Sequence, residues 1–338
     1  MKTMMKVSCL FIALACVAQL GYGQQRKAGL TGAAFLKVGV GARAVAMGSA
    51  VTAMSGDVNQ MFWNPAGIAL KDEQMQASFS YNKWIADLSH NAFAVSYNLH
   101  DVGTIGFGVI MFGLNGIEAD RDIPVDPGLA PFQIDQNTST SYDYSDLALQ
   151  LTFARNVMDN LSLGISMKYV SQTIDGISAT AIAFDFGSVY DIGVYDWKIA
   201  ARFNNLGSDM KYYDIAFGLP LSFSIGTSIA PISSGDSKVT VAVDAIKPQD
   251  GPQYFYTGAE YSFMNMVAVR AGYKLNYSGT DDGGTSSRAA VNSTIEGISL
   301  GAGFATNLMG YGIHLDYSYT QMDLLDAAHR VTVSVAVK

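Results

Sequence analysis

Fourteen segments of this chain alternate apolar and polar side chains with a period of two. In residues 311–319, for example, Tyr311, Ile313 and Leu315 are apolar, whereas His314 and Asp316 lie between them. A period of two places successive side chains on opposite faces of a β-strand. The charges in these segments gather on one of the two faces, and we therefore predict an all-β fold, a closed antiparallel barrel with lipid outside and a polar lumen.

Composition supports a membrane protein without spanning helices. Only 15% of the 338 residues are charged, against about 25% in typical soluble domains. Beyond the N-terminus no run of 18 apolar residues occurs, although a helix needs roughly that many to cross a bilayer. A closed barrel is the other structure that satisfies every backbone group in lipid.

The spacing of turn residues divides the barrel into fourteen transmembrane strands. With the N-terminus in the periplasm, the even-numbered connections should be short and the odd-numbered ones extracellular and longer. The sequence follows this order, and its long connections are residues 114–144, 207–218 and 276–295. The expected strands are 75–83, 91–100, 103–113, 145–155, 161–171, 179–190, 197–206, 219–231, 238–246, 253–263, 266–276, 296–306, 310–321 and 328–337.

The N-terminus predicts export to the outer membrane of a Gram-negative bacterium. Lys2 and Lys6 precede an apolar stretch, and Gly23 ends a cleavage site made of small residues, so residues 1–23 read as a signal peptide. The alternative is a lipoprotein signal with lipidated Cys16. Cys9 and Cys16 are the only cysteines, so the mature chain is expected to contain neither disulfide nor reactive thiol. Residues 24–74 would form a plug and residues 75–338 the barrel.

Charge and histidine positions exclude several classes of partner and cofactor. Without Lys2 and Lys6, 19 basic and 29 acidic residues leave a net charge of −10, which argues against nucleic acid as a partner. His90, His100 and His329 lie at strand ends, so no metal or other cofactor is expected. The acidic runs at 118–122 and 281–282 are best read as solvated loops.

The face opposite the apolar one carries four acidic and four basic residues. Because the signs balance, we expect ion pairs that brace the lumen rather than a selective pore, which usually shows an excess of one sign. A charged path for a solute is the alternative. The residues are Lys168, Asp185, Arg202, Asp244, Glu260, Arg270, Lys274 and Asp316.

Residues 35–70 are too apolar to remain in the periplasm and too short to form a domain. They read as two short helical pieces, one of them residues 42–54, which would plug the lumen or its lower rim. Arg43 is a lone cation in the first piece. It would pair with a lumen carboxylate such as Asp244, Glu260 or Asp316 and lock the plug, or it would meet an anionic ligand.

The pattern V-G-V-G-A-R-A-x-A-M-G-S-A, followed by D-x5-W-N-P-A-G-I-A, resembles the start of the PorV/PorQ family, outer-membrane barrels of Bacteroidota distantly related to the FadL transporters. The resemblance implies a fourteen-stranded barrel whose N-terminal segment lies near the periplasmic mouth. It also implies a role in type IX secretion, in which PorV-like members receive the C-terminal signal of cargo from the translocon. The matching residues are Gly39, Gly41, Ala42, Arg43, Met47, Gly48, Asp57, Trp63, Asn64, Pro65, Ala66 and Gly67. The chain departs from many barrels in ending on Lys338 without a terminal aromatic residue.

We therefore expect an accessory barrel that binds a translocon or cargo through its loops, with outer-membrane lipid around it. The alternative is a FadL-like transporter of hydrophobic compounds, which needs an apolar pocket. The inner face offers mostly serine, glycine and charge, although the plug residues Val45, Met47, Val51 and Met54 would line a small pocket.

No enzymatic activity is expected, because no catalytic group emerges from the sequence. His314, Asp316 and Ser318 share one face of one strand, but such neighbours stand about 6.8 Å apart, too far for a hydrogen-bond relay.

Overall fold

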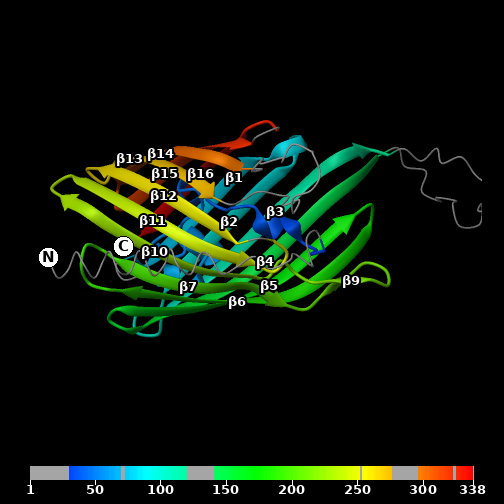
Figure 1. The fold of residues 1–338 in the computed structure, drawn as a ribbon, viewed down its shortest axis with the longest axis horizontal. Coiled ribbons are helices and arrows are strands. Elements are labelled where there is room, and N and C mark those ends of the chain that lie inside the picture. Colours follow the sequence, from blue (N-terminus) through cyan, green and yellow to red (C-terminus); the bar gives the residue numbers. More distant parts are fainter. Residues whose placement is uncertain are drawn as a thin grey trace, which may run out of the picture.

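The computed structural model describes residues 30–69, 73–119, 141–251, 253–275, 296–322 and 325–337. Fourteen strands close into one barrel in which every neighbour pairs antiparallel, and β1 closes the ring against β16 (Figure 1). The strands are β1 (Met75–Lys83), β2 (Ser89–Asn98), β3 (Thr104–Glu118), β4 (Ser141–Met158), β5 (Leu161–Ile174), β6 (Ile177–Asp191), β7 (Lys198–Gly207), β10 (Ser222–Ser234), β11 (Ser237–Pro248), β12 (Tyr254–Phe263), β13 (Val267–Leu275), β14 (Glu296–Leu308), β15 (Tyr311–Met322) and β16 (Ala328–Val337).

The predicted fold class is confirmed, and each expected strand is present. The main difference is length, because β3 and β4 continue into residues expected to be a loop: Ile117 pairs with Tyr142 beyond a register shift. Strands β3 to β6 have 14 to 18 residues, whereas β1 has nine. In Figure 1 they reach past the rest of the barrel at one end.

The connections define the two ends of the barrel. The short ones, such as residues 159–160 and 309–310, lie at one end, which is the periplasmic end by the rule for outer-membrane barrels. At the other end, the connection between β7 and β10 contains two further strands, β8 (Met210–Lys211) and β9 (Ala216–Phe217). The sequence had suggested only a loop there. Residues 120–140 and 276–295, which make up most of the other long connections, lie outside the described residues, as does the predicted signal peptide.

The side chains alternate between an apolar outer face and a small, polar inner face. On β1, for instance, Phe79 is 50% exposed on the outside, whereas Ser80 is 3% exposed on the inside. This period-two burial is what the pleat of a strand imposes when one face meets lipid. Among the described residues, no helix is long and apolar enough to cross a membrane.

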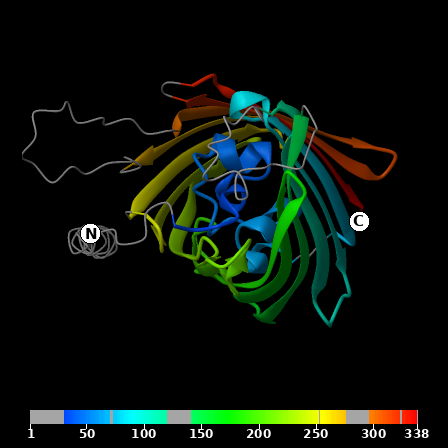
Figure 2. The ribbon, with the colours of Figure 1, turned by 90° about the vertical axis from the view of Figure 1, so that its right-hand side faces the viewer.

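The N-terminal segment fills the lumen with short helical turns, drawn in blue inside the ring of strands in Figure 2. They are η1 (Ala34–Lys37), α2 (Ala42–Ala46), η2 (Val58–Phe62) and η3 (Pro65–Ile68). A further turn, η4 (Ile85–Asp87), joins β1 to β2. The plug therefore has four helical turns where the sequence had suggested two pieces.

The expectation of one helical piece over residues 42–54 is wrong. Helix α2 ends at Ala46 because Gly48 and Ser49 take left-handed backbone angles, with φ of 61° and 66°. The Ser49 N–H donates to Ala44 O and the Gly48 N–H donates to Val45 O. These bonds satisfy the last carbonyls of the helix in a Schellman cap.

Candidate functional site: the plugged lumen

The plug enters the barrel from the extracellular end, not from the periplasmic mouth. Thr31 forms a bridge with Gly218 in the extracellular connection between β7 and β10. Asp250, between β11 and β12, accepts a 2.5 Å hydrogen bond from the Thr31 hydroxyl and forms an ion pair with Lys37. From there the segment descends to Asp57, which shares a cavity with Gln76 at the periplasmic end. The implied location near the periplasmic mouth is therefore wrong for the first described residues of the plug, which runs through most of the lumen.

Glycines of the plug meet glycines of the wall where the two backbones touch. A β-carbon on Gly48 would stand 2.6 Å from Thr257 O and 2.6 Å from Tyr273 N, on β12 and β13. One on Gly272 would stand 1.9 Å from Gly48 N. Such approaches exclude any side chain. The glycines at 48 and 272 thus let the plug backbone lie directly on the wall.

The tryptophan–asparagine–proline element ties the turns of the plug together. Trp63 Nε1 donates to Val40 O over 2.9 Å, and Asn64 Oδ1 accepts from Ala66 N at the start of η3. Asn64 Nδ2 donates to Thr52 O, 2.7 Å away, and to Ser188 O on β6. Pro65 takes the first position of η3, where its missing N–H is not needed. These motif residues hold the plug in shape and against the barrel wall.

The other motif residues also shape the plug or hold it against the barrel wall. Asp57 begins η2 by accepting a 2.8 Å hydrogen bond from Asn59 N. Gly39 packs closely against Trp63, and Gly67 against Gln60, while Gly41 has a φ of 84°. Ala42 N donates to Thr332 Oγ1 on β16, and Met47 is fully buried.

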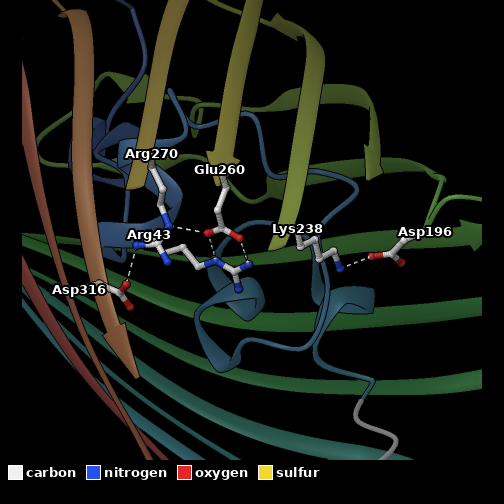
Figure 3. A network of polar contacts seen from close by, with 6 residues as sticks. All are labelled: Arg43, Asp196, Lys238, Glu260, Arg270 and Asp316. Carbon is white, nitrogen blue, oxygen red and sulfur yellow. Dashed lines mark hydrogen bonds and ion pairs between the residues drawn. The ribbon is translucent and has the colours of Figure 1, made fainter. Parts of the chain in front are cut away.

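Arg43 joins the plug to the barrel wall. Its Nε and Nη2 donate to the two oxygens of Glu260 on β12 over 2.9 and 2.7 Å (Figure 3). Such a bidentate pair fixes orientation as well as charge. The charge of Glu260 raises the pKa of the Arg43 guanidinium above its ordinary value, outweighing the opposite effect of burial. Of the three carboxylates considered from the sequence, Arg43 thus binds Glu260.

Glu260 is also the start of a chain of buried charges. Arg270 on β13 donates to Glu260 Oε2 over 2.5 Å and to Asp316 Oδ1 on β15 over 2.6 Å. The network therefore links the plug to three strands, as Figure 3 shows. Asp316 is thus bound by Arg270, whereas the Ser318 Oγ on the same strand has no hydrogen-bond partner among the described residues.

The other five predicted lumen residues are also buried, each with 5% exposure or less except Arg202 at 6%. Lys168 pairs with Asp185 at 2.6 Å, and Lys274 forms an ion pair with Glu296. Asp244 accepts hydrogen bonds from the N–H and hydroxyl of Thr52 in the plug. Arg202 lies over the Trp63 ring, 5.5 Å from its centroid. Buried charges need such partners because desolvation is costly.

At the periplasmic rim, a second small cluster joins neighbouring turns. Asp196, between β6 and β7, pairs with Lys198 at 3.0 Å. It also pairs with Lys238 of β11 at 2.8 Å (Figure 3). Burial acts to raise the pKa of Asp196, but the two lysines lower it below its ordinary value. The Asp196 carboxyl is therefore ionised at neutral pH.

Cavities remain above and below the plug. The lower one has a volume of about 320 Å³ and is lined by the charges around Arg43 and Asp196. The upper one, about 170 Å³, lies between Trp63 and the extracellular ends of β11 and β12. The apolar plug residues Val45, Met47, Val51 and Met54 pack with Trp63, Ala242, Ile246 and Tyr256. Val45, Met47 and Val51 are thus covered by these partners, whereas Met54 also lines the lower cavity, and Trp63, Ile246 and Tyr256 line the upper one.

A model of a known protein family, described as type IX secretion system protein PorV, matches residues 22–249. That match takes in the whole plug and the wall as far as β11. The chain belongs to the PorV family. It is an outer-membrane β-barrel, and the plug motif that first suggested the family lies inside the matched region.

Solved structures similar to this PorV-family chain share its fold. The toluene transporter TbuX of Ralstonia pickettii is 14% identical with a TM-score of 0.54, covering 88% of this chain and 97% of its own. The toluene transporter TodX of Pseudomonas putida is 12% identical with the same score and coverage. A FadL homologue of Pseudomonas aeruginosa is 12% identical with a TM-score of 0.51, covering 85% of this chain and 95% of its own. At such identities the likeness establishes the FadL-like fold alone. No curated protein matches the chain.

Sequence reasoning missed several buried polar residues of this PorV-family lumen. Arg330 is 2% exposed on the inner face of β16, in the same parity as the buried Thr332, so the alternation could have found it. Glu296 is the first residue of β14 and follows a long connection. The residues before it show no alternation from which its face could have been predicted. His90 is 2% exposed on β2 and packs edge-on against Phe112. In the described part of the chain, no group of three or more His, Cys, Asp or Glu residues could hold a metal.

Proposed function

We propose that this chain is a non-enzymatic partner barrel of type IX secretion, which holds secreted proteins at its extracellular end as they leave the translocon. The family match over residues 22–249 carries the proposal. The closed lumen supports it, because the plug is bound to the wall from Asp250 at one end to Glu260 toward the other. A protein with a blocked lumen must work at its ends rather than through its middle.

The extracellular end offers a surface suited to this role. Strands β3 to β6 rise beyond the rest of the barrel there, and the β8–β9 connection carries Tyr213 and Ile215, 72% and 71% exposed. Exposed aromatic and aliphatic side chains at one end are typical of protein interaction sites. The predicted partners are therefore the translocon and the C-terminal signal domains of its cargo.

Purification of a tagged copy from outer membranes would test the proposal. We expect co-purification of translocon components and of secreted proteins that share a C-terminal domain, with an unrelated tagged outer-membrane barrel as the control. Deletion of the gene should leave those secreted proteins in the periplasm. Normal secretion after deletion would contradict the proposal.

The second candidate, a transporter of hydrophobic compounds, shares the same fold but needs an apolar path. The described lumen instead places Ser80, Ser224, Ser299 and the charge network on its inner face. Normal secretion combined with lost growth on a hydrophobic carbon source would favour this candidate.

A further inference from the structure

The upper cavity combines an aromatic lining with a buried cation. Trp63 and Phe62 of the plug form one side, and Tyr254 and Tyr256 of β12, whose rings stack 6.3 Å apart, form another. Its volume of about 170 Å³ is far above the roughly 10–15 Å³ that one water requires. It is also below the roughly 300 Å³ at which drug-sized sites begin. The space suits one small group.

Arg202 of β7 lines this cavity without an anionic partner in contact with it. It is 6% exposed, and its Nε has no hydrogen-bond partner among the described residues. Of the two carboxylates that act on it electrostatically, Asp185 is bound by Lys168, and Asp244 is bound by Thr52 through Oδ2, whereas its Oδ1 has no hydrogen-bond partner among the described residues. A buried guanidinium that lies over an indole, with an unpaired Nε and no carboxylate at ion-pair distance among the described residues, is the arrangement that an incoming carboxylate would complete.

A bulge in β7 places a hydrogen-bond acceptor beside that cation. Between the pairs Phe184–Leu206 and Phe186–Phe203, the β6–β7 register shifts, and both Asn204 and Asn205 are buried on the inner face. Asn204 Nδ2 donates to Trp63 O over 2.9 Å, which fixes the orientation of the amide. Its Oδ1 accepts no hydrogen bond from the described residues. Bulges often re-aim side chains next to functional sites.

We infer that the upper cavity binds the C-terminal residue of an extended peptide. The α-carboxylate would pair with Arg202, the last amide N–H would donate to Asn204 Oδ1, and an apolar side chain would lie among Trp63, Phe62 and Tyr256. A fatty acid would supply the carboxylate but has no N–H beside it. The inference rests on the proposed function, since it identifies which part of a secreted partner enters the barrel.

The cavity is placed for entry from outside the cell. Lys37, Pro248 and Asp250 line it, and they lie where the plug meets the connection between β11 and β12 at the extracellular end. A terminal residue held by a cell-surface protein could therefore reach Arg202 without crossing the charge network below.

Peptide binding to the purified full chain in detergent tests this inference directly. The probes are three fluorescent hexapeptides ending in leucine: one with a free carboxylate, one with a C-terminal amide, and one whose last amide is an ester. We expect saturable anisotropy for the free acid and at least tenfold weaker binding for the other two, because each lacks one partner. N-acetylleucine, which has both the carboxylate and the amide N–H, should compete with the free-acid peptide. Its affinity relative to that peptide shows whether the cavity takes an acylated amino acid or a peptide terminus. Equal binding of acid and amide would overturn the inference.

A variant of the chain provides the reciprocal measurement. Arg202→Gln should weaken binding of the free acid at least tenfold and leave the already weak amide unchanged, whereas Lys238→Met at the opposite end should bind as the parent does. The thermal midpoint of each variant reports folding, and the three-peptide comparison on the unmodified chain holds even if Arg202→Gln does not fold. Co-purification with the translocon would still succeed if only this inference were wrong, so its failure is distinguishable from failure of the proposed function.

Discussion

At the scale of single residues, the lumen is organised by paired charges rather than by apolar contacts. Glu260 is the central acceptor, since it binds Arg43 of the plug and Arg270 of the wall. Because the carboxylate lies between two guanidiniums, the loss of either arginine leaves the other interaction in place. The plug is therefore held by a contact that can be weakened without dismantling the wall.

Replacing Arg43 with alanine should loosen the plug while the barrel stays folded. The pair is bidentate but the Arg43 side chain is 32% exposed, so we expect a loss of about 1–3 kcal/mol in plug stability. Leakage of large antibiotics or detergent across the outer membrane should rise, as measured by growth inhibition. Arg43→Lys, which keeps the charge, should show a smaller increase. Unchanged permeability would contradict the locking role.

At the scale of elements, the plug is held by close backbone contacts with the wall and by the Asp250 clamp. In this clamp, Asp250 at the extracellular end binds Thr31 and Lys37. Its helical turns have five residues or fewer and would not persist alone in water, since isolated short helices are unstable. They persist because the wall supplies glycines under α2 and hydrogen-bond partners for Asn64 and Ala42.

Gly48→Ala tests the backbone contact. The new β-carbon would meet Thr257 O and Tyr273 N at 2.6 Å, and the residue has a φ of 61°. We expect a loss of about 2–4 kcal/mol from overpacking and backbone strain together. Gly56→Ala is the matched control, because Gly56 has a φ of 86° but nothing within 4 Å of a β-carbon, so only about 1–2 kcal/mol should be lost. Thermal unfolding in detergent compares the two, and equal losses would show that the wall contact contributes nothing.

The Asp250 clamp should respond to pH. Burial raises the pKa of the Asp250 carboxyl, but hydrogen bonds from Lys37 and Thr31 and the charge of Lys37 lower it below its ordinary value of about 3.9. A lowered pKa means that the clamp is fully stabilising above about pH 4 and is lost as pH falls through the lowered value. Protease cleavage after Lys37 should therefore be slow at pH 7 in the parent.

In Asp250→Asn, the same cleavage should be fast at pH 7, while cleavage after Lys83, whose side chain is 64% exposed at the end of β1, serves as the internal control. Identical cleavage rates in parent and variant would show that Asp250 does not hold the segment.

At the scale of the whole molecule, the outer face marks where the bilayer lies. On β4 the outward residues change from Asp143 and Ser145 to Leu147, Leu149, Leu151 and Phe153, and then to Arg155. Four alternate apolar positions bounded by polar ones match the apolar band of an outer-membrane barrel. The extracellular part of β4 therefore stands clear of lipid, in the wall that β3 to β6 raise.

Leu151→Arg should destabilise the inserted barrel by about 2–4 kcal/mol, because Leu151 lies within the apolar band, 61% exposed on the outer face. Ser145→Arg, on the same face of the same strand but outside the band, should change stability by less than about 1 kcal/mol. Folding into vesicles, followed by gel mobility without heating, measures both. A tolerated Leu151→Arg would move the membrane boundary away from this part of β4.

The alternation in the sequence determined the barrel, its fourteen strands and the inner face of its eight charges, because a period of two is a local property of each strand. The plug motif indicated the family, and the family match over residues 22–249 confirmed it. Strand lengths were less accessible, because the added residues of β3 and β4, such as Ile117 and Tyr142, become strand by pairing across the barrel wall rather than through a local pattern.

The tertiary structure alone decided where those local elements meet. It assigned Glu260 rather than Asp244 or Asp316 to Arg43, and it brought the first plug residues to the extracellular Asp250, because a segment without periodicity does not specify which end of the lumen it contacts. It also placed Asn204 and Asn205 on one face through a bulge that interrupts the alternation. A period-two pattern predicts which side of a strand a residue faces, but only the closed barrel brings distant residues into contact.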